Sequence, residues 1–270
     1  MSKIAVQNIT VDYTERNRSF TALKDVCFEV QAGEFVSVIG SSGCGKSTLL
    51  SILEGINTPT EGTILIDGEP INGTGTDRGV VFQHYSLFPW MTARKNIAFG
   101  IKQARQGLSK AERLEIADEF LEKVGLEGFG NKYPSQLSGG MQQRVAIARA
   151  LAMDTDILLM DEPFGAIDAK NRTILQELLL ELWEGDGSQE RKTVIFVTHD
   201  IDEAIFLSDR IIMMSANPGT VYRDIEVPFE RPRVRSELVV TPEYSSFRND
   251  LMGLFYGDIA EKIGGSEVVL

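Results

Sequence analysis

Alternating hydrophobic and polar positions predict two strands at the start of the chain. Apolar side chains recur at nearly every second position, first at Ile4, Val6, Ile9, Val11 and Tyr13, and again at Val26, Phe28 and Val30. This is the period of a half-buried strand, and the two runs favour an antiparallel pair. The polar stretch 14–19 lies between them and is the expected hairpin loop.

Continuous apolar runs predict further strands that are buried on both faces, as in the centre of a parallel sheet. These runs are Phe35–Ile39, Ile157–Met160 and Val194–Val197. Shorter strands are expected at Thr63–Ile66, which Asp67-Gly68 would close as a hairpin turn, and at Gly79–Gln83.

Helical spacing separates these strands. Helices are expected over Lys46–Glu54 and Lys170–Leu182, and residues 89–152 are mainly helical in pattern. Ser109 and Glu112 form a capping-box pair that opens a helix ending near Gly125. Alternating strands and helices predict an α/β fold with a doubly wound, mainly parallel sheet, to which an antiparallel β subdomain and an inserted α-helical subdomain are added.

Composition narrows the class of protein. The chain has 270 residues, 43% hydrophobic and 24% charged, which is typical of a globular and not a disordered protein. The net charge of −12 argues against a nucleic-acid partner, which needs a basic face. No signal peptide or membrane-spanning run is expected, and Cys27 and Cys44 have no metal-ligand partners at useful spacing, so we expect a cytoplasmic protein.

The first chemical motif is a glycine-rich loop between a strand and a helix. It has the pattern G-x-x-x-x-G-K-[ST] and consists of Gly40, Ser41, Ser42, Gly43, Cys44, Gly45, Lys46 and Ser47, followed by Thr48. Glycines let the backbone N–H groups turn towards phosphate oxygens at the positive end of a helix. Lys46 can reach the β- and γ-phosphates, and Ser47 can offer its hydroxyl to Mg²⁺. The alternative is a glycine-rich turn with a chance lysine.

Two further motifs are interpreted together with this glycine-rich loop. Asp161 and Glu162 end an apolar strand, where carboxylates can hold Mg²⁺ and polarise water, although such an ending is also commonplace structure. Ser138, Gly139 and Gly140 precede a helix and form a second potential anion site, and the alternative is an ordinary helix N-cap at Ser138.

In this order the motifs resemble those of the ATP-binding cassette (ABC) family of P-loop NTPases, from Ile4 to about Val227. The resemblance implies binding and hydrolysis of ATP with Mg²⁺, whose ligands would be Ser47, Gln83 and Asp161. It implies catalytic roles for Glu162, Gln83 and His199. It places the D-loop at Phe164-Gly165-Ala166-Ile167-Asp168, and it gives Tyr13, or else Phe20, as the aromatic that stacks on adenine. His84 is taken as structural.

Two positions depart from the family pattern. Met141 stands where the signature loop Leu137–Met141 usually ends in glutamine, and Ile167 replaces the usual leucine of the D-loop. By the resemblance, residues 1–230 form the ATPase domain with about 89–152 inserted, and residues 231–270 form a tail with a short helix near Tyr244–Phe255.

Phe88 and Trp90, in Leu87-Phe88-Pro89-Trp90, together with the tail 228–233, resemble the nitrate, sulfonate and taurine importer branch. The two aromatics suit docking to a membrane permease, and the alternative is that both pack the helical subdomain. The resemblance implies a head-to-tail homodimer, a permease, indirectly a solute-binding protein, and a peripheral location on the cytoplasmic face of the membrane. It does not identify the solute.

Two alternative functions agree less well with the sequence. A soluble ABC-type ATPase acting on nucleic acid or ribosomes tends to carry a long coiled coil or two cassettes, neither of which this sequence predicts. A non-hydrolysing nucleotide sensor conflicts with the intact Asp161-Glu162 pair.

Overall fold

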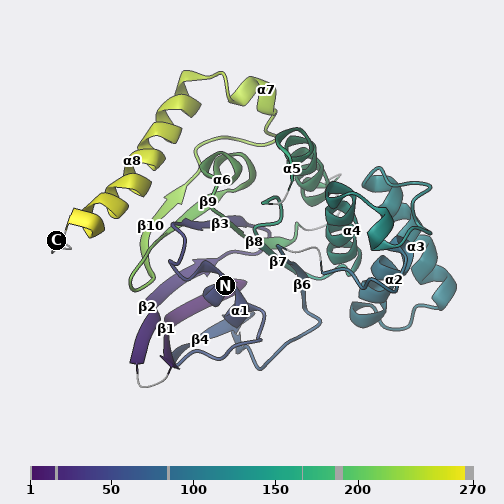
Figure 1. The fold of residues 1–270 in the computed structure, drawn as a ribbon, viewed down its shortest axis with the longest axis horizontal. Helices are drawn as coiled ribbons and strands as arrows, with labels where there is room; N and C mark the ends of the chain where they lie inside the picture. The colour runs from purple at the N-terminus through teal and green to yellow at the C-terminus, as the bar shows by residue number, and fades with distance from the viewer. Residues whose placement is uncertain (1, 16–17, 84–85, 166, 186–190, 265–270) are drawn as a thin grey trace. The chain divides into compact units, whose positions relative to one another are not determined.

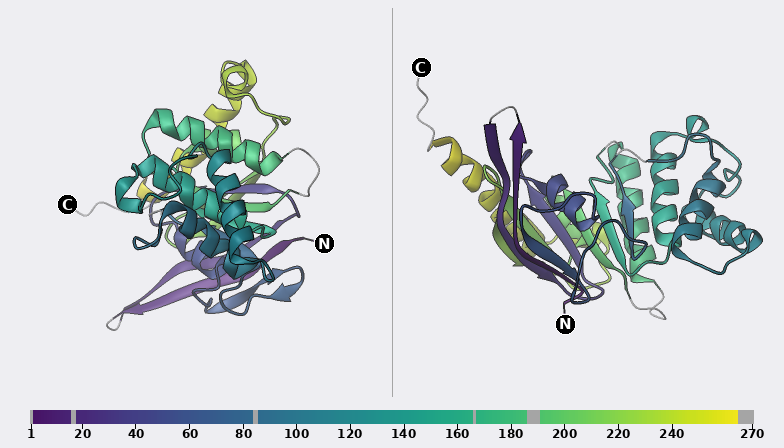
Figure 2. Two further views of the ribbon diagram at one scale, coloured as in Figure 1. Left: turned by 90° about the vertical axis from the view of Figure 1, so that its right-hand side faces the viewer. Right: turned by 90° about the horizontal axis from the view of Figure 1, so that it is seen from below.

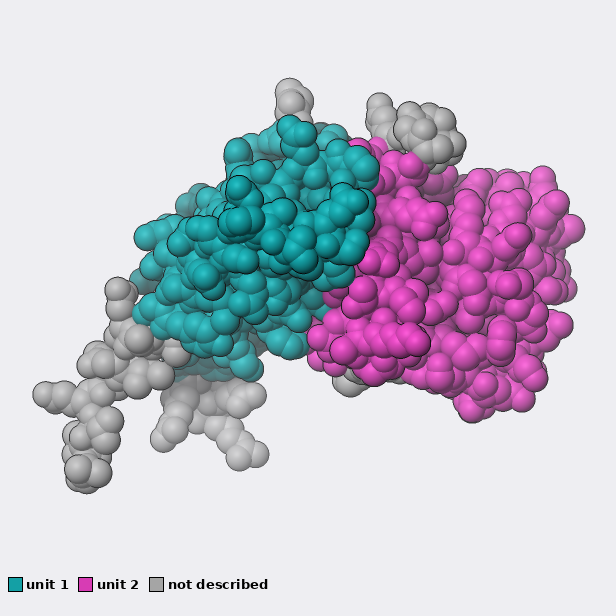
Figure 3. Space-filling model, turned by 90° about the horizontal axis from the view of Figure 1, so that it is seen from above, with its two compact units in different colours: residues 1–73, 196–270 teal, residues 74–195 magenta. Residues whose placement is uncertain are grey.

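The computed structural model describes residues 2–15, 18–83, 86–165, 167–185 and 191–264 (Figure 1). The chain folds into two compact units (Figure 3). Unit 1 consists of Met1–Gly73 and Phe196–Leu270, and unit 2 consists of Thr74–Ile195. The chain therefore leaves unit 1 after its first 73 residues and returns to it within one strand.

The N-terminal part of unit 1 is an antiparallel sheet in the order β2-β1-β4-β5. Its two long N-terminal strands are drawn in purple in Figure 2. Its strands are β1 (Ile4–Glu15), β2 (Arg18–Val30), β4 (Glu61–Ile66) and β5 (Glu69–Pro70). The predicted antiparallel pair is confirmed, because Ile4 pairs with Val30 and Tyr13 with Phe20.

The predicted hairpin loop is too long. Thr14 pairs with Ser19 inside the ladder, and residues 16–17 lie outside the described part of the chain. The rings of Tyr13 and Phe20 face each other with centroids 5.5 Å apart. Cross-strand aromatic pairs stabilise a sheet. This contact explains why the two strands remain paired into the polar stretch that the sequence pattern assigned to the loop.

A second group of strands in unit 1 has the order β10-β9-β3-β8. It contains β3 (Phe35–Gly40), β9 (Arg210–Ser215), β10 (Thr220–Glu226) and the end of β8 (Thr193–Thr198). β3 and β9 are parallel, and β9 and β10 are antiparallel. The helices α1 (Lys46–Leu53) and α6 (Ile201–Leu207) pack against β3. β9 and β10 were not among the predicted strands.

The C-terminal segment of unit 1 forms two helices, α7 (Arg235–Leu238) and α8 (Pro242–Gly264). The expected short helix at Tyr244–Phe255 is therefore too short at both ends. α8 packs against α6 and β9, and it buries Tyr244 and Leu251 in one apolar cluster with Ile201 and Ile205. This burial stabilises a longer helix than the weak sequence pattern predicts.

Unit 2 contains β6 (Arg78–Val81), β7 (Ile157–Asp161) and the start of β8, in the order β8-β7-β6, with β6 and β7 parallel. Its helices are α2 (Ala93–Ala104), α3 (Lys110–Lys123), the 3₁₀ turn η1 (Pro134–Gln136), α4 (Gly139–Ala152) and α5 (Ala169–Glu184). The predicted capping box of α3 is confirmed by Glu112 N, which donates to Ser109 Oγ at 3.2 Å, and by Ser109 N, which donates to Glu112 Oε2 at 2.7 Å.

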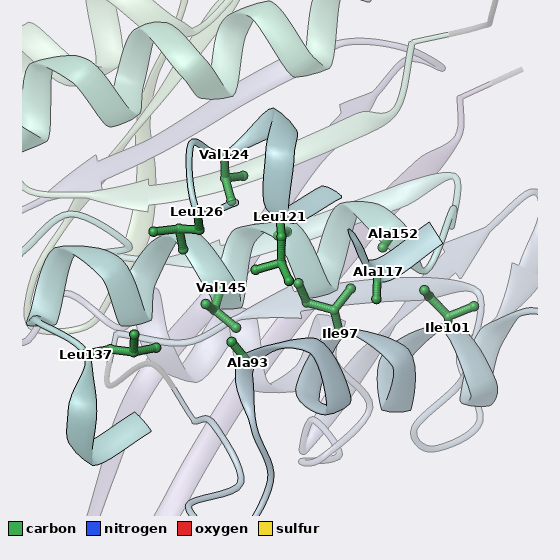
Figure 4. Close-up of a cluster of buried hydrophobic side chains, with 11 residues drawn as sticks. Ala93, Ile97, Ile101, Ala117, Leu121, Val124, Leu126, Leu137, Val145 and Ala152 are labelled. Carbon is green, nitrogen blue, oxygen red and sulfur yellow. The ribbon is translucent and has the colours of Figure 1, made fainter. Parts of the chain in front are cut away.

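An apolar core joins α2, α3 and α4 (Figure 4). Ile97, Leu121 and Val145 come from the three helices and are buried together. Full burial of one such side chain contributes about 1.5–3 kcal/mol, so this cluster holds the three helices as one body. Both units combine strands with helices, and the α/β fold with parallel and antiparallel sheets is confirmed.

Within the described residues, no helix has both the length and the hydropathy that crossing a membrane requires.

Candidate functional site: the phosphate loop, the acid pair and the signature loop

The glycine loop of unit 1 has the geometry of a phosphate cradle. β3 is buried along its whole length and ends at Gly40, and α1 begins at Lys46. Gly45 caps α1 with φ 93°, and a Cβ there would lie 2.4 Å from Leu23 Cδ2. At Gly40 a Cβ would lie 2.6 Å from Cys44 Sγ. Side chains are therefore excluded at both glycines, and the loop can close tightly around the start of the helix.

Lys46 lies inside this loop. Its side chain is buried, and Nζ donates to Gly40 O at 2.7 Å and to Ser41 O at 3.2 Å. No side chain caps the N-terminus of α1, so its first N–H groups remain available to an anion. Ser47 follows on the exposed side of the helix. The loop thus presents a cation, helix N–H groups and a hydroxyl in one place.

Cys44 fills the base of the loop. It is buried, and Lys46 Nζ lies 3.7 Å from its sulfur. Burial raises the pKa of the Cys44 thiol, and nearby Lys46 only partly opposes this effect. A neutral thiol that fills space agrees with assigning it no chemistry.

The acid pair of unit 2 lies at the end of β7. Asp161 is the last residue of the strand, and Glu162 follows with φ 40°, a left-handed conformation that is unusual for a glutamate. Gln83 follows the parallel neighbour β6, and its Nε2 donates to Glu162 Oε2 at 3.3 Å. The structure therefore brings together two predicted catalytic residues that lie 79 positions apart in the sequence. His84, next to Gln83, lies outside the described residues.

The serine–glycine motif of unit 2 begins α4. Ser138 is its N-cap, and its Oγ accepts from Met141 N at 3.3 Å. The N-cap interpretation of Ser138 is thus correct for the local geometry. Leu137 and Met141 pack against the helical core, which explains how methionine is accommodated in the fifth position of the loop. Ser138 itself is exposed, with Gly139 and Gly140 in the first turn.

Asp168 of the D-loop caps α5 beside this motif. Its carboxylate accepts from Asn171 N at 3.1 Å and from Asn171 Nδ2 at 2.7 Å. These bonds hold the pKa of the Asp168 carboxyl below its usual value. A Cβ on Gly140 would lie 3.9 Å from the Asn171 side chain, so the first turns of α4 and α5 are neighbours. Ala166 lies outside the described residues.

His199 of unit 1 follows β8 directly and is exposed. Asp200 then caps α6, because its Oδ1 accepts from Asp202 N at 2.9 Å and from Glu203 N at 3.2 Å. Thr198 Oγ1 donates to Glu203 Oε2 at 2.6 Å. The turn that carries His199 is therefore tied to α6 on both sides.

The two aromatic candidates for adenine stacking lie next to each other on paired strands. Tyr13 is half-buried and Phe20 is 57% exposed, and their rings form one cross-strand pair. Phe88 packs edge-on against Phe99 at 4.7 Å, whereas Trp90 is 69% exposed. The packing alternative therefore describes Phe88, and only Trp90 offers a large exposed surface.

Sequence reasoning missed Asn96, which shapes the loop before α2. Its fully buried side chain accepts from Phe88 N at 2.8 Å and donates to Met91 O at 3.1 Å and to Thr92 O at 3.1 Å. It also missed the contacts of the tail arginines. A polar residue on a helix gives no sequence signal of such long-range bonds.

Each unit by itself offers oxygen donors of the kind that bind Mg²⁺, a cation that proteins often share with nucleotide phosphates. No cluster of three or more His, Cys, Asp or Glu side chains that could hold a metal occurs among the described residues. Mg²⁺ usually binds one or two protein oxygens together with phosphates and water, so such a cluster is not required. Ser47, Gln83 and Asp161 offer oxygen ligands of the right kind.

A buried strand, a glycine loop with an enclosed lysine, and a strand ending in acids define a P-loop nucleoside triphosphatase. The family model described as ABC transporter matches residues 23–165. The chain belongs to this family, and it binds and hydrolyses ATP. A solved dimeric ATP-binding cassette, in a post-hydrolysis state with ADP and Pi, matches with a TM-score of 0.73 and 40% identity, over 84% of this chain and 100% of that one.

Two curated relatives are similar over most of the chain. The nitrate import ATP-binding protein NrtD of Synechococcus elongatus is 50% identical over 88% of this chain and 85% of its own length. The bicarbonate transport ATP-binding protein CmpC of the same species is 47% identical over 92% of this chain and 37% of its own length. A soluble ATPase that acts on nucleic acid or ribosomes is not favoured by these relatives.

Proposed function

We propose that the chain is the ATPase subunit of a solute importer of the nitrate, sulfonate and taurine type, working with a separate membrane permease. The names of the nitrate and bicarbonate relatives support this function. The observation that carries it is the loop that encloses Lys46, in a chain that also brings Gln83 to Glu162. We assign 1–230 to the ATPase domain, with about 89–152 as an inserted helical subdomain, and 231–270 to a tail.

ATP would bind with its phosphates in the loop Gly40–Ser47 and the following Thr48. Lys46 would replace some of its hydrogen bonds to loop carbonyls with bonds to the β- and γ-phosphates, because charged phosphate oxygens are stronger acceptors. The N–H groups at the start of α1 would add dipole-assisted bonds. Tyr13 would stack on the adenine, with Phe20 as its cross-strand support.

Mg²⁺ would be held by Ser47, Gln83 and, through water, Asp161, and it would neutralise charge on the phosphates. Gln83 donates through Nε2 to Glu162, which leaves the amide oxygen as the atom suited to a cation. One side chain would therefore link the cation site to the catalytic carboxylate.

Glu162 would act as the general base that takes a proton from the attacking water, and Gln83 would orient the Glu162 carboxylate. The left-handed backbone of Glu162 supports this role, because such strain of about 1–3 kcal/mol concentrates at functional sites. His199, on its fixed turn after β8, would contact the γ-phosphate from unit 1.

Two copies would pair head to tail, with Ser138, Gly139 and Gly140 of one subunit against the ATP of the other. A hydroxyl has two lone pairs and one proton, so Ser138 can accept from Met141 N and still donate to a phosphate. A two-fold interface of this kind is self-complementary, so one sequence encodes both sides. The dimeric cassette structure supports this assembly.

Trp90 would be the permease contact, since it combines a large apolar surface with 69% exposure. The subunit would then lie peripherally on the cytoplasmic face of the membrane and meet a solute-binding protein only through the permease. The acidic net charge of −12 supports the absence of a nucleic-acid partner.

A membrane pull-down tests the permease partnership. Tagged chain should retain a multi-span protein from detergent-solubilised membranes of the native cell, and Trp90→Ala should weaken that capture at least tenfold, as expected for an aromatic hot spot of about 2 kcal/mol. Val240→Ala, which shortens another exposed apolar residue, is the control. Equal capture by the wild type and Trp90→Ala would contradict the assigned contact, and capture of ribosomes or nucleic acid instead would contradict the importer function.

A further inference from the structure

The C-terminal segment from Phe229 to Leu251 holds the helix that follows His199. α6 has only seven residues, and a helix this short is unstable in isolation. It begins two positions after His199, so whatever fixes α6 also fixes the backbone from which this histidine extends. Besides the cap at Asp200 and the packing on β3, residues of the C-terminal segment contact both ends of this helix.

At the C-terminal end of α6, two arginines satisfy the last carbonyls. Arg233 Nη1 donates to Ile205 O at 2.9 Å, Phe206 O at 3.1 Å and Ser208 O at 2.7 Å. Arg231 Nη2 donates to Leu207 O at 2.6 Å. These are carbonyls that a helix leaves without intrahelical partners, and cations are favoured at this end of the helix dipole.

Arg233 is itself fixed in place. It is 9% exposed, and its Nε and Nη2 donate to Phe229 O at 3.1 and 2.8 Å. Arg231 Nε donates to Asp209 Oδ1 at 2.7 Å. The guanidinium of Arg235 lies 3.8 Å from the centre of the Phe206 ring. The end of α6 is thus enclosed by planar cations that have little freedom to move.

At the N-terminal end, Asp202 links α6 to α8. Its Oδ1 accepts from Tyr244 OH at 2.7 Å and from Arg248 Nε at 2.7 Å, and its Oδ2 accepts from Arg248 Nη2 at 3.0 Å. Burial alone would raise the pKa of Asp202, but the bonds from Arg248 and Tyr244 outweigh it and lower this pKa. Between the two ends, Tyr244 and Leu251 cover the apolar face formed by Ile201 and Ile205.

We propose that Arg233 and Arg248 are positioning residues for His199, acting through the two ends of α6. The inference rests on the proposed role of His199 in ATP hydrolysis. Loss of either arginine would let α6 shift and move the histidine, without touching the phosphate loop. Hydrolysis would slow, while ATP binding through Lys46 would persist.

Histidine NMR on the full-length protein tests this directly, because the chain has only two histidines, His84 and His199. With ¹³C-labelled histidine, His84→Asn assigns the signals. Arg248→Ala and Arg233→Met should shift or broaden the His199 signal and leave the His84 signal in place. Arg210→Ala is the matched control: it removes ion pairs with Glu34 and Asp224 in the same unit, none of which involves α6.

Steady-state ATPase kinetics provide the second readout. The two variants should lower kcat, by about tenfold or more for Arg233→Met since a 1 Å misplacement can cost about 100-fold, with KM for ATP unchanged. Arg233→Lys should recover part of the loss. Arg248 is partly exposed, so Arg248→Ala remains informative if Arg233→Met does not fold.

An unmoved His199 signal in every folded variant would overturn the inference, and so would equal shifts in Arg210→Ala. A rise in KM without a fall in kcat would also overturn it. If the signal moves but His199→Ala hydrolyses ATP at the normal rate, the proposed role of His199 is wrong, and positioning it has no catalytic consequence.

Discussion

Lys46 and Arg233 are both buried cations of unit 1, and both donate hydrogen bonds to backbone carbonyls. They lie at opposite kinds of helix end. Lys46 is the first residue of α1, where the helix dipole disfavours a cation, and Arg233 meets the last carbonyls of α6, where the dipole favours one. A cation held against the dipole is suited to attract an anion, whereas a cation aligned with it stabilises the fold.

The largest effect is expected at Glu162, which we propose acts in hydrolysis, whereas we propose that Lys46 binds ATP. Glu162→Gln keeps the size and hydrogen bonding of the side chain but removes the carboxylate that would accept a proton from the attacking water. Hydrolysis should fall by roughly 10²–10⁴-fold, the span of a positioned general base, with ATP affinity retained. Phosphate release measures this, and Glu177→Gln on the exposed side of α5 is the control. Near-normal phosphate release would remove Glu162 from the catalytic role.

The loop glycines offer a matched pair that tests how the cradle around Lys46 is built. Gly45 and Gly43 both have positive φ, but a Cβ clashes with Leu23 only at Gly45. Gly43→Ala should lose about 1–2 kcal/mol of stability through its left-handed backbone. Gly45→Ala should lose about 1–3 kcal/mol more through overpacking. Urea unfolding measures both, and equal losses would mean that the loop relaxes around the added methyl.

Tyr13 and Phe20 form one aromatic pair, in which we propose that Tyr13 contacts the ligand and Phe20 contacts only Tyr13. Stacking on a base contributes about 1–3 kcal/mol, so Tyr13→Ala should weaken ATP binding by at least about fivefold. Phe20→Ala should weaken it less, because in the proposed arrangement Phe20 contacts Tyr13 and not the base. Binding of a fluorescent ATP analogue distinguishes them, and a larger loss in Phe20→Ala would transfer the stacking role to Phe20.

The smallest effect concerns the pH dependence of the contact between Asp202 and Arg248. The pKa of Asp202 is lowered in the folded state, so its stabilisation is complete above the unfolded value of about 3.9 and is lost as pH falls through the folded value. The pair is partly exposed, and we expect at most about 1 kcal/mol. The stability difference between wild type and Asp202→Asn should therefore be present at pH 7 and shrink below about pH 4 in urea titrations. A difference that persists unchanged at pH 3 would exclude this ionic contribution.

Local patterns were enough to predict the phosphate loop, the strands at Phe35 and Ile157, and the capping box at Ser109. In each case the signal lies within a few neighbouring residues. The pairing of Thr14 with Ser19, the length of α8 and the separate environments of Phe88 and Trp90 were not predicted. These features depend on contacts between distant residues, such as the burial of Tyr244 against α6 and the edge-on packing of Phe88 on Phe99.

For the functional residues too, local patterns and the resemblance predicted which residues matter but not which distant residues they contact. Gln83 was predicted from the resemblance alone, and Glu162 was already a candidate because it follows a strand end. Their hydrogen bond arises because two parallel strands place their ends together. The bonds of Arg233 to α6 join residues 25 to 28 positions apart. Nothing in the spacing of a tail arginine indicates which carbonyls it will meet.

Calorimetric titration of ATP tests the central claim that Lys46 binds the ATP phosphates, whereas the tail arginines hold α6 in place and do not contact ATP. Charge-assisted contacts contribute about 1.5–3 kcal/mol each, so Lys46→Ala should bind ATP at least tenfold more weakly than wild type. Arg248→Ala should bind ATP with unchanged affinity. Unchanged affinity in folded Lys46→Ala, or an equal loss in Arg248→Ala, would contradict the account.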